Sequence, residues 1–484
     1  MSRITRETAD GVRWILLQKC TLQPVTLVYS MVLARLLSKE EMGLMGLTAI
    51  FFTAAGTLAA NGFGSALIRK QNRTNEDADT MFWFNLGMGG LISLFFFLSA
   101  PWLAVFFEAP QLCNLVRASA IMVLLNAASN VHMAYYMARR QFKTPALISL
   151  GSALAAMPLC LLLAWQGWGV WAYMVQGIAA AALSTALFWH LCPWRPGYRF
   201  SRASFRELAP MGCRMAATGL LDTAYIHARA FFIGKVYTPA ALAGYKNGAQ
   251  LAAMGPTVLC YMIDQISYPI LSTLQHSQQK LIGVYRRYMR LFSIPIAWLC
   301  FFTTAFAEPL VRICYGPGWE EAVPYLQILS LSYATWHLQI INLNLLKAGG
   351  PPRLFLRLEI IKKCLGVSIL IGMFFISVEA ICWGALATSA LCLGINTWVT
   401  RRYMGLPILP QLQDWVPVFA LAGGCTTLPL LLQNHLSPLP LTLIGGISSL
   451  ALYVGILRLL APAALRDAWH TAQHIAQGNK SLPI

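Results

Sequence analysis

Charged residues are scarce in this sequence of 484 residues, where Asp, Glu, Lys and Arg together make up only 11%. Soluble domains carry about 25% charged and about 45–50% apolar residues, whereas here 57% of the residues are apolar and the mean hydropathy is +0.58. This composition excludes a cytosolic enzyme, a disordered chain and a nucleic-acid-binding protein. At ~20 residues for each crossing, the apolar residues would fill about fourteen membrane spans.

Motifs that hold nucleotides or metals are also lacking. The sequence contains no G-x-x-x-x-G-K-[ST] phosphate loop and no H-E-x-x-H, and Gly62 and Gly64 are not followed by the third glycine of a dinucleotide-binding loop. The twelve cysteines include no C-x-x-C pair, so they predict neither a zinc site nor a disulfide framework. These absences favour a protein that is not an enzyme, and we expect no catalytic residue, no metal and no cofactor.

Fourteen apolar segments are candidates for membrane-spanning helices, and the connections between them alternate in charge. One set of connections is rich in Lys and Arg, as at 139–143, 195–206 and 286–290, while the other holds little beyond Lys39, Lys235 and Arg312. The positive-inside rule places the basic set, and with it both chain termini, in the cytoplasm. The predicted spans are 12–36, 42–68, 81–107, 112–138, 145–166, 169–191, 208–236, 240–272, 285–308, 321–346, 354–377, 379–400, 415–433 and 438–461.

The second half of the chain repeats features of the first. Residues 34–38 end the first span as 234–238 end the seventh, and 106–110 precede the fourth span as 314–318 precede the tenth. A nearly constant offset indicates two parallel six-helix lobes related by a pseudo-two-fold axis along the membrane normal. The predicted domains are an N-terminal lobe over 1–191, a cytoplasmic linker over 192–206, a C-terminal lobe over 207–402, and helices 13 and 14 with a cytoplasmic tail over 403–484.

Polar residues recur at helical spacing in four predicted spans. On the seventh span they fall within an arc of about 80°, and on the first and eighth within about 60°. The second span keeps Thr53, Thr57 and Asn61 near one face. Because the repeat pairs spans 1 and 2 with spans 7 and 8, we expect these stripes to line one central cavity. The candidate substrate-binding residues are Lys19, Gln23, Arg214, Asp222, Tyr225, Arg229, Lys246, Gln250, Tyr261 and Asp264.

Basic residues outnumber acidic ones in this candidate set. A charge at the bilayer centre costs at least ~2.5–3.5 kcal/mol, so it usually faces water or a partner. The basic surplus favours an anionic ligand such as pyrophosphate, whose oxygens accept charge-assisted hydrogen bonds. Structural roles stay open as well. Lys19 and Arg214 lie close enough to the cytoplasmic side to snorkel, and Asp222 and Arg229 can neutralise neighbours within a helix interface.

Six short segments also carry a family resemblance: Leu33–Gly43, Asn61–Arg69, Met81–Asn85, Pro239–Asn247, Tyr268–Gln275 and Leu356–Lys363. They resemble the turn and packing signatures of the Wzx/WzxC-type polysaccharide flippases, which belong to the multidrug/oligosaccharidyl-lipid/polysaccharide exporter superfamily. The resemblance covers roughly residues 8–405. Its motifs are specific for the family and say little about the substrate.

This resemblance implies an all-α, multi-pass protein of the bacterial inner membrane, with two helix bundles around a central cavity. Such a protein would move an undecaprenyl-pyrophosphate-linked oligosaccharide to the outer leaflet by alternating access, for O-antigen, capsule or exopolysaccharide export. The implied partners are the lipid-linked oligosaccharide, the lipid bilayer, a polysaccharide polymerase with its export machinery, and H⁺ or Na⁺ as coupling ion. No nucleic acid is expected.

Two other functions compete with this interpretation. A multidrug or cation antiporter would use Asp222 and Asp264 as a compact acidic site within about twelve spans, which the basic surplus and helices 13 and 14 disfavour. A polytopic glycosyltransferase or polymerase is disfavoured because every predicted extracytoplasmic loop is about ten residues or shorter. The sequence chooses neither among the exported polymers nor between ion coupling and the membrane potential as the driving force.

Overall fold

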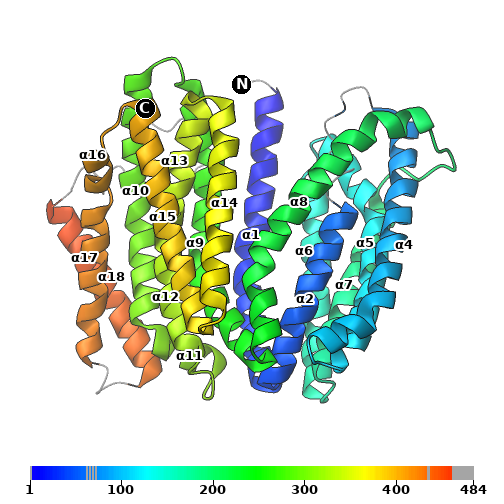
Figure 1. Cartoon of the computed structure of the whole chain (residues 1–484), viewed down its shortest axis with the longest axis horizontal. Helices are drawn as coiled ribbons and strands as arrows, with labels where there is room; N and C mark the ends of the chain where they lie inside the picture. Colours follow the sequence, from blue (N-terminus) through cyan, green and yellow to red (C-terminus); the bar gives the residue numbers. More distant parts are fainter. Residues whose placement is uncertain are drawn as a thin grey trace. The chain divides into compact units, whose positions relative to one another are not determined.

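The computed structural model describes residues 3–60, 64, 67, 70, 73–432 and 437–460, and these residues form helices and no β-strand (Figure 1). The helices are α1 (Arg3–Leu36), α2 (Lys39–Ala60), α4 (Asn75–Phe106), α5 (Gln111–Ala138), α6 (Lys143–Trp165), α7 (Val170–Leu191), α8 (Arg202–Val236), α9 (Pro239–Thr273), α10 (Gln278–Ala305), α11 (Ala307–Tyr315), α12 (Ala322–Ala334), α13 (Trp336–Gly349), α14 (Pro352–Phe374), α15 (Val378–Met404), α16 (Ile408–Gln413), α17 (Val416–Thr427), the short 3₁₀ helix η1 (Leu428–Leu432) and α18 (Pro438–Leu460).

Each of the fourteen predicted spans contains helix, which confirms the all-α prediction. The predicted span 321–346 is broken at Thr335 into α12 and α13, and the span 415–433 into α17 and η1. The second predicted span is described as helix α2 to Ala60, and Asn61 of its polar face lies outside the described residues. The predicted tail beyond residue 460 also lies outside them.

Apolarity varies among these helices in a way that bears on function. Among the described residues, eight helical stretches are long and apolar enough to cross a membrane, so the chain is a multi-pass membrane protein. Helices α8 and α9 are longer than most of these, at 35 residues each, yet they are not among the eight. Both carry one of the predicted polar stripes, and the stripes lower their apolarity.

The chain divides into two compact units, residues 1–243 (unit 1) and 244–484 (unit 2). Unit 1 includes α8, because α8 packs along α2 and also contacts α4. The predicted lobes, by contrast, divide at the linker 192–206. That division was drawn from the sequence repeat, and it stays a prediction about how the two halves are related.

The repeat is visible in the turns that join α1 to α2 and α8 to α9. The second turn lies 200 positions after the first. In the first turn the Ser38 hydroxyl accepts the backbone N–H of Glu41, and in the second the Thr238 hydroxyl accepts that of Ala241, each at 3.2 Å. Both turns therefore start the following helix with the same kind of N-cap.

These two turns also meet within unit 1. A Cβ built on Gly43 of α2 would lie 2.0 Å from the carbonyl oxygen of Pro239, the first residue of α9. A Cβ on Gly234 near the end of α8 would lie 2.4 Å from a methyl carbon of Leu47. Glycine at both positions is what allows the backbones to approach so closely.

The linker after α7 is fixed to the beginning of α4. The backbone N–H of Gly197 donates to the Asp79 carboxylate at 3.0 Å, and the Trp83 indole N–H donates to the Gly197 carbonyl at 2.8 Å. The backbone N–H of Ser201, which caps α8, donates to the Thr80 hydroxyl at 3.0 Å. These contacts hold the linker against unit 1.

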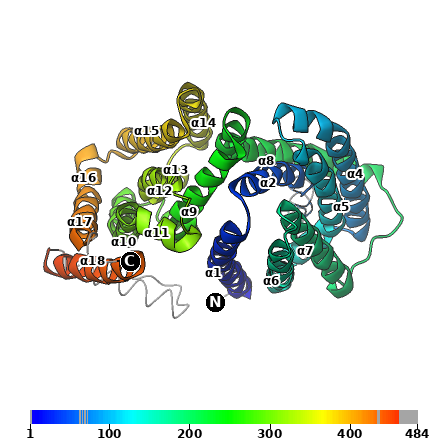
Figure 2. The same ribbon diagram turned by 90° about the horizontal axis from the view of Figure 1, so that it is seen from below.

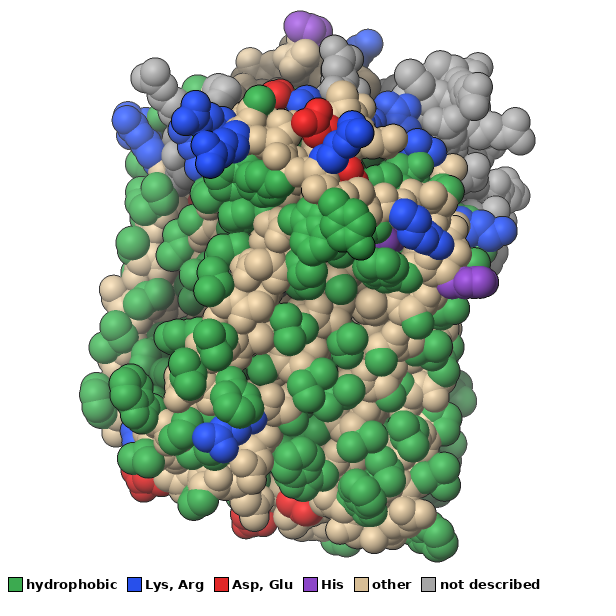
Figure 3. Space-filling view, turned by 90° about the vertical axis from the view of Figure 1, so that its right-hand side faces the viewer, with side chains coloured by type: hydrophobic (Ala, Val, Ile, Leu, Met, Phe, Trp, Pro, Cys, Tyr) green, Lys and Arg blue, Asp and Glu red, His purple; other side chains and the backbone are tan. Residues whose placement is uncertain are grey.

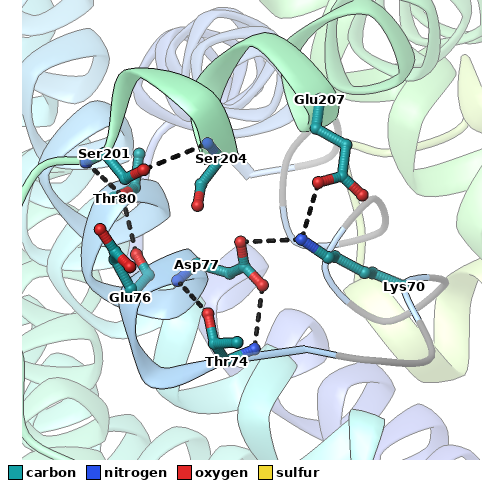
Figure 4. A network of polar contacts seen from close by, with 8 residues as sticks. All are labelled: Lys70, Thr74, Glu76, Asp77, Thr80, Ser201, Ser204 and Glu207. Atoms are coloured by element: carbon teal, nitrogen blue, oxygen red, sulfur yellow. Dashed lines mark hydrogen bonds and ion pairs between the residues drawn. The ribbon is translucent and has the colours of Figure 1, made fainter.

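An ion network lies beside this linker (Figure 4). The Lys70 ammonium donates to Asp77 at 3.0 Å and to Glu207 of α8 at 2.9 Å. Asp77 is almost fully buried and also forms the capping box of α4 with Thr74. The hydrogen bond to Glu207, together with that to Asp77, raises the pKa of Lys70 above its ordinary value. The network thus joins the segment after α2 to the starts of α4 and α8.

Unit 2 has a polar core of its own. The buried Tyr285 hydroxyl of α10 donates to the Asn342 side-chain carbonyl of α13 at 2.9 Å, and Thr400 of α15 donates to the same oxygen at 3.0 Å. The Arg286 guanidinium donates two hydrogen bonds to the Asp414 carboxylate, at 2.7 and 3.0 Å. These bonds tie α10, α13 and α15 to the segment before α17.

The surface of unit 1 reflects its place in a membrane. Figure 3 shows hydrophobic side chains over the middle of this face and Lys and Arg side chains gathered near one end. The exposed apolar residues include Phe95, Trp102 and Val105 of α4, which are 66%, 81% and 78% exposed. Such a large exposed apolar surface suits contact with lipid.

Candidate functional site

Helix α8 presents one face to α2 and the opposite face away from it. On the packed face, the Thr223 and Thr57 hydroxyl oxygens lie 3.1 Å apart, and Ala230 is buried. Phe231 adds an edge-on contact to the ring of Phe51. Thr223, Ala230 and Gly234 recur at helical spacing, so they form one continuous strip along the contact with α2.

The predicted stripe lies on the other side of α8. At 100° per residue, Arg214, Asp222, Tyr225 and Arg229 lie about 100° to 180° around the helix from Thr223. Arg214 is exposed and the other three are half-buried. No described carboxylate of unit 1 forms an ion pair with Arg214 or Arg229. The two guanidinium groups therefore share this face with the Asp222 carboxylate, and two Arg against one Asp leave a positive surplus on it.

The stripe of α1 is less strongly polar than the sequence predicts. Lys19 is exposed and Gln23 is half-buried. The hydroxyls of Thr26 and Ser30, which lie on the same face of α1, donate to the Leu22 and Leu27 carbonyls of their own helix at 2.7 and 2.8 Å. These two hydroxyls are already satisfied, which leaves Lys19 and Gln23 as the ligand candidates of α1.

In unit 2 the stripe of α9 is tied to α13. The Asp264 carboxylate accepts a hydrogen bond from the Asn344 amide at 2.9 Å, and the same amide donates to the buried Ser267 hydroxyl at 2.9 Å. The Lys347 ammonium donates to the Asn344 side-chain carbonyl at 3.4 Å. Acid, amide and ammonium thus form one chain of hydrogen bonds between α9 and α13.

The other α9 candidates lie along the same helix. Lys246, Gln250 and Tyr261 are half-buried. Each unit therefore holds its own part of the predicted site: Lys19, Gln23 and the α8 stripe in unit 1, and the α9 stripe in unit 2. That the two parts enclose one cavity stays a prediction.

Sequence reasoning missed Asn344 and Lys347 as neighbours of the site. Lys347 directly follows the predicted span 321–346, and Asn344 lies within it. A sequence signal exists, because Asn342 and Asn344 are amides within a predicted membrane span, and buried amides need hydrogen-bond partners. The described residues contain no group of three His, Cys, Asp or Glu side chains that could hold a metal ion.

Comparison with known proteins gives this geometry a context. A family model described as "Polysaccharide biosynthesis protein" matches residues 32–324, more than half of the chain. The succinoglycan biosynthesis transport protein ExoT of Rhizobium meliloti is 22% identical over 322 residues, covering 66% of this chain and 65% of ExoT. The lipopolysaccharide biosynthesis protein WzxC of Escherichia coli is 20% identical over 329 residues, covering 67% of each chain. The chain thus matches about two thirds of the length of these relatives.

Solved structures show a similar fold. The lipid II flippase MurJ in an inward closed conformation superposes with a TM-score of 0.74 at 11% identity, covering 93% of this chain and 100% of MurJ. An inward-facing multidrug resistance transporter of the MATE family, in the MOP superfamily, gives a TM-score of 0.56 at 14% identity, covering 81% of this chain and 98% of the transporter. At these identities the likeness concerns the fold alone.

Proposed function

Because this chain belongs to the family of polysaccharide biosynthesis proteins, we propose that it is a flippase for lipid-linked oligosaccharides. It carries undecaprenyl-pyrophosphate-linked polysaccharide repeat units across the inner membrane by alternating access. One observation carries the proposal: α8 holds Arg214 and Arg229 on the face turned away from α2, and no described carboxylate of unit 1 pairs with them. The names of ExoT and WzxC and the fold shared with MurJ support it.

The chemistry of the substrate explains why such a face is needed. The pyrophosphate of a lipid carrier is anionic, and leaving water without compensation is costly for a charged group. Arg214 and Arg229 offer planar guanidinium groups that bind phosphate oxygens through paired, charge-assisted hydrogen bonds. Lys19 and Lys246 add positive charge. In this proposal, Gln23, Tyr225, Gln250 and Tyr261 meet the sugars.

The acidic candidates have a different part. Asp222 and Asp264 moderate the positive charge of the site, and a proton or sodium ion taken up at either carboxylate would couple transport to an ion gradient. Asp264 already belongs to a hydrogen-bonded chain with Asn344 and Lys347. No covalent step is required, since moving the headgroup through a hydrated path lowers the barrier to crossing without breaking a bond.

The orientation follows from the distribution of charge along the sequence. The basic connections, as at 139–143 and 286–290, lie on the cytoplasmic side together with both termini. The protein then receives its substrate on the cytoplasmic face and releases it to a polymerase and export machinery on the other. The O-antigen, capsule and exopolysaccharide pathways all supply substrates of this class.

The test compares cells with and without the protein. Deleting the gene should cause lipid-linked repeat units to accumulate on the cytoplasmic face, measured by extracting the lipids and by testing their access to an external sugar oxidant in right-side-out vesicles. Purified protein in proteoliposomes should restore that access. If the deletion leaves the lipid-linked pool unchanged while drug tolerance falls, the protein is a multidrug antiporter and the proposal is wrong.

A further inference from the structure

Unit 1 contains a cavity of about 320 Å³ that the polar stripes do not explain. It lies among α2, α5, α6 and α7, which pack against one another within this unit (Figure 2). Its volume is at the small end of the range for ligand pockets, about 300–1,000 Å³. All of its lining residues belong to unit 1.

The lining of this cavity is mainly apolar, with uncharged polar side chains set into it. It includes hydroxyl and amide side chains from all four helices, with aromatic and aliphatic side chains such as Phe52 and Met174 between them, and no Asp, Glu, Lys, Arg or His. A buried ion needs a countercharge or a full set of hydrogen bonds. The cavity therefore suits a neutral ligand, in contrast to the arginines on α8.

One of these polar groups, the Ser152 hydroxyl, lacks a protein partner. The Ser152 side chain is 2% exposed, and its hydroxyl has no hydrogen-bond partner among the described residues. Buried polar groups in folded proteins are normally hydrogen-bonded, so Ser152 points to a ligand that offers such a bond. The half-buried Gln176 accepts the Tyr29 hydroxyl at 2.8 Å through its side-chain oxygen, and its amide N–H groups stay available as donors to the same ligand.

Other hydroxyls in the lining provide a contrast. Thr48 donates to the Leu44 carbonyl at 2.8 Å and Ser119 to the Val116 carbonyl at 2.7 Å, each within its own helix. Those hydroxyls need no ligand. The donors and acceptors left over, on Ser152 and Gln176, belong to α6 and α7 and line the same cavity.

We propose that this cavity binds a single neutral sugar unit through Ser152 and Gln176. A sugar ring combines several neutral hydroxyls with apolar C–H faces, which matches hydroxyl and amide groups set among Phe52 and Met174. The sugar comes either from the lipid-linked oligosaccharide or from a free mono- or disaccharide. The first source rests on the proposed function; sugar binding itself does not.

The test uses the full-length protein in lipid nanodiscs and diazirine photoprobes of glucose, galactose and N-acetylglucosamine. Mass spectrometry should find saturable labelling on peptides of α5, α6 and α7. Excess unlabelled neutral sugar should reduce the labelling, and glucuronate should not. Ser152→Ala and Gln176→Leu should each weaken binding about fivefold, the effect of losing one hydrogen bond. Ser129→Ala is the matched control, because it removes a buried hydroxyl of α5 that donates to the Asn126 carbonyl and does not line the cavity, and it should leave binding unchanged.

Competition separates the two sources of the sugar. Lipid-linked repeat units should suppress the labelling while undecaprenyl pyrophosphate alone does not; suppression by free sugar alone assigns the cavity to a free saccharide. Absence of saturable labelling by any neutral sugar, or labelling that Ser152→Ala and Gln176→Leu both leave unchanged, overturns the inference. Flipping of lipid-linked substrate is assayed in the same preparation, so the failure of the cavity proposal is distinguishable from failure of the proposed function. Thermal unfolding of each variant verifies that it is folded.

Discussion

Helices α8 and α9 have the same length and follow one another in the chain, yet their charged residues have different surroundings. On α8, Arg214 is exposed, Arg229 is half-buried, and no described carboxylate of unit 1 pairs with either. On α9, the Asp264 carboxylate is bound by the Asn344 amide of the neighbouring α13. The comparison shows that the two arginines of α8 do not contribute to the packing of unit 1 through an ion pair, whereas Asp264 of α9 contributes to the packing of unit 2 through its hydrogen bond.

Reversing the charge on α8 should have the largest effect. In Arg214→Glu and Arg229→Glu, a carboxylate replaces the guanidinium proposed to bind pyrophosphate and would repel it, so we expect export to fall about a hundredfold with little change in membrane abundance. Surface polysaccharide and protein level, both measured by immunoblot in a deletion strain, report the two quantities.

Arg206→Glu provides the matched control for these variants. Arg206 is exposed near the start of α8. It lies about 100° around the helix axis from Thr223, in the direction opposite to that of the stripe. Export should stay near the wild-type level. Equal losses in Arg206→Glu and Arg229→Glu would mean that overall charge on α8 matters and that the stripe has no special role.

The close approach of the two repeat-related turns allows a second test. A Cβ at position 43 would already lie 2.0 Å from the Pro239 carbonyl oxygen, and Gly43→Val adds two methyl groups to that Cβ. The turn between α1 and α2 can then no longer lie against the turn between α8 and α9. Overpacking typically costs about 1–3 kcal/mol. We expect a lower melting temperature and a tenfold loss of export.

Gly56→Ala on the same helix is the control, because a Cβ at Gly56 would meet nothing within 4 Å. That variant should be as stable as the wild type or slightly more stable, since alanine favours helix. Normal export by Gly43→Val would show that the approach of the two turns is dispensable.

Removing the acid of α9 should have a smaller, structural effect. Asp264→Ala leaves the Asn344 amide with only Ser267 as acceptor, and a lost partner in a buried site costs about 1–3 kcal/mol. Asp264→Asn keeps an oxygen that can accept from Asn344 and should recover most of that stability. Thermal unfolding of both purified variants measures the difference. Equal melting temperatures of the wild type and both variants would show that Asp264 does not contribute to the packing of unit 2.

Export by Asp264→Asn then addresses ion coupling separately from stability. If this carboxylate carries a coupling proton or sodium ion, export becomes insensitive to the ion gradient while the melting temperature stays close to that of the wild type. If export keeps its dependence on the gradient, Asp264 serves the packing of α9 and α13 alone.

The sequence predicts the helices well because most spans are apolar runs bounded by polar turns, and the others keep helical spacing in their polar residues. The place of α8 is harder to predict, since the contact between Thr57 and Thr223 joins residues 166 positions apart and no local pattern encodes it. The Asp264–Asn344 bond escapes prediction for the same reason. The cavity around Ser152 is also hidden in the sequence, because Ser119 and Ser152 look alike there and differ only in whether a helix carbonyl satisfies them.

We expect the smallest effect from the ion network at the start of α8, where Lys70 is paired with Asp77 and Glu207. Lys70→Gln removes the cation between Asp77 and Glu207, while the Thr74 cap on Asp77 stays in place. Since Glu207 is 60% exposed, its pair contributes little, and we expect a loss of about 1 kcal/mol. Arg73→Gln, at an exposed position in the same segment, should change nothing.

The pH dependence of the stability difference between wild type and Lys70→Gln shows which group causes it. Folding raises the pKa of Lys70 above its ordinary 10.5, so the stabilisation is fully present below pH 10.5 and is lost as the pH rises through the higher folded value. The melting temperatures of wild type and Lys70→Gln should therefore differ by a constant amount from pH 6 to 9 and converge only at strongly alkaline pH. A difference that already shrinks between pH 6 and 8 would assign the effect to a different group, because an ammonium does not titrate there.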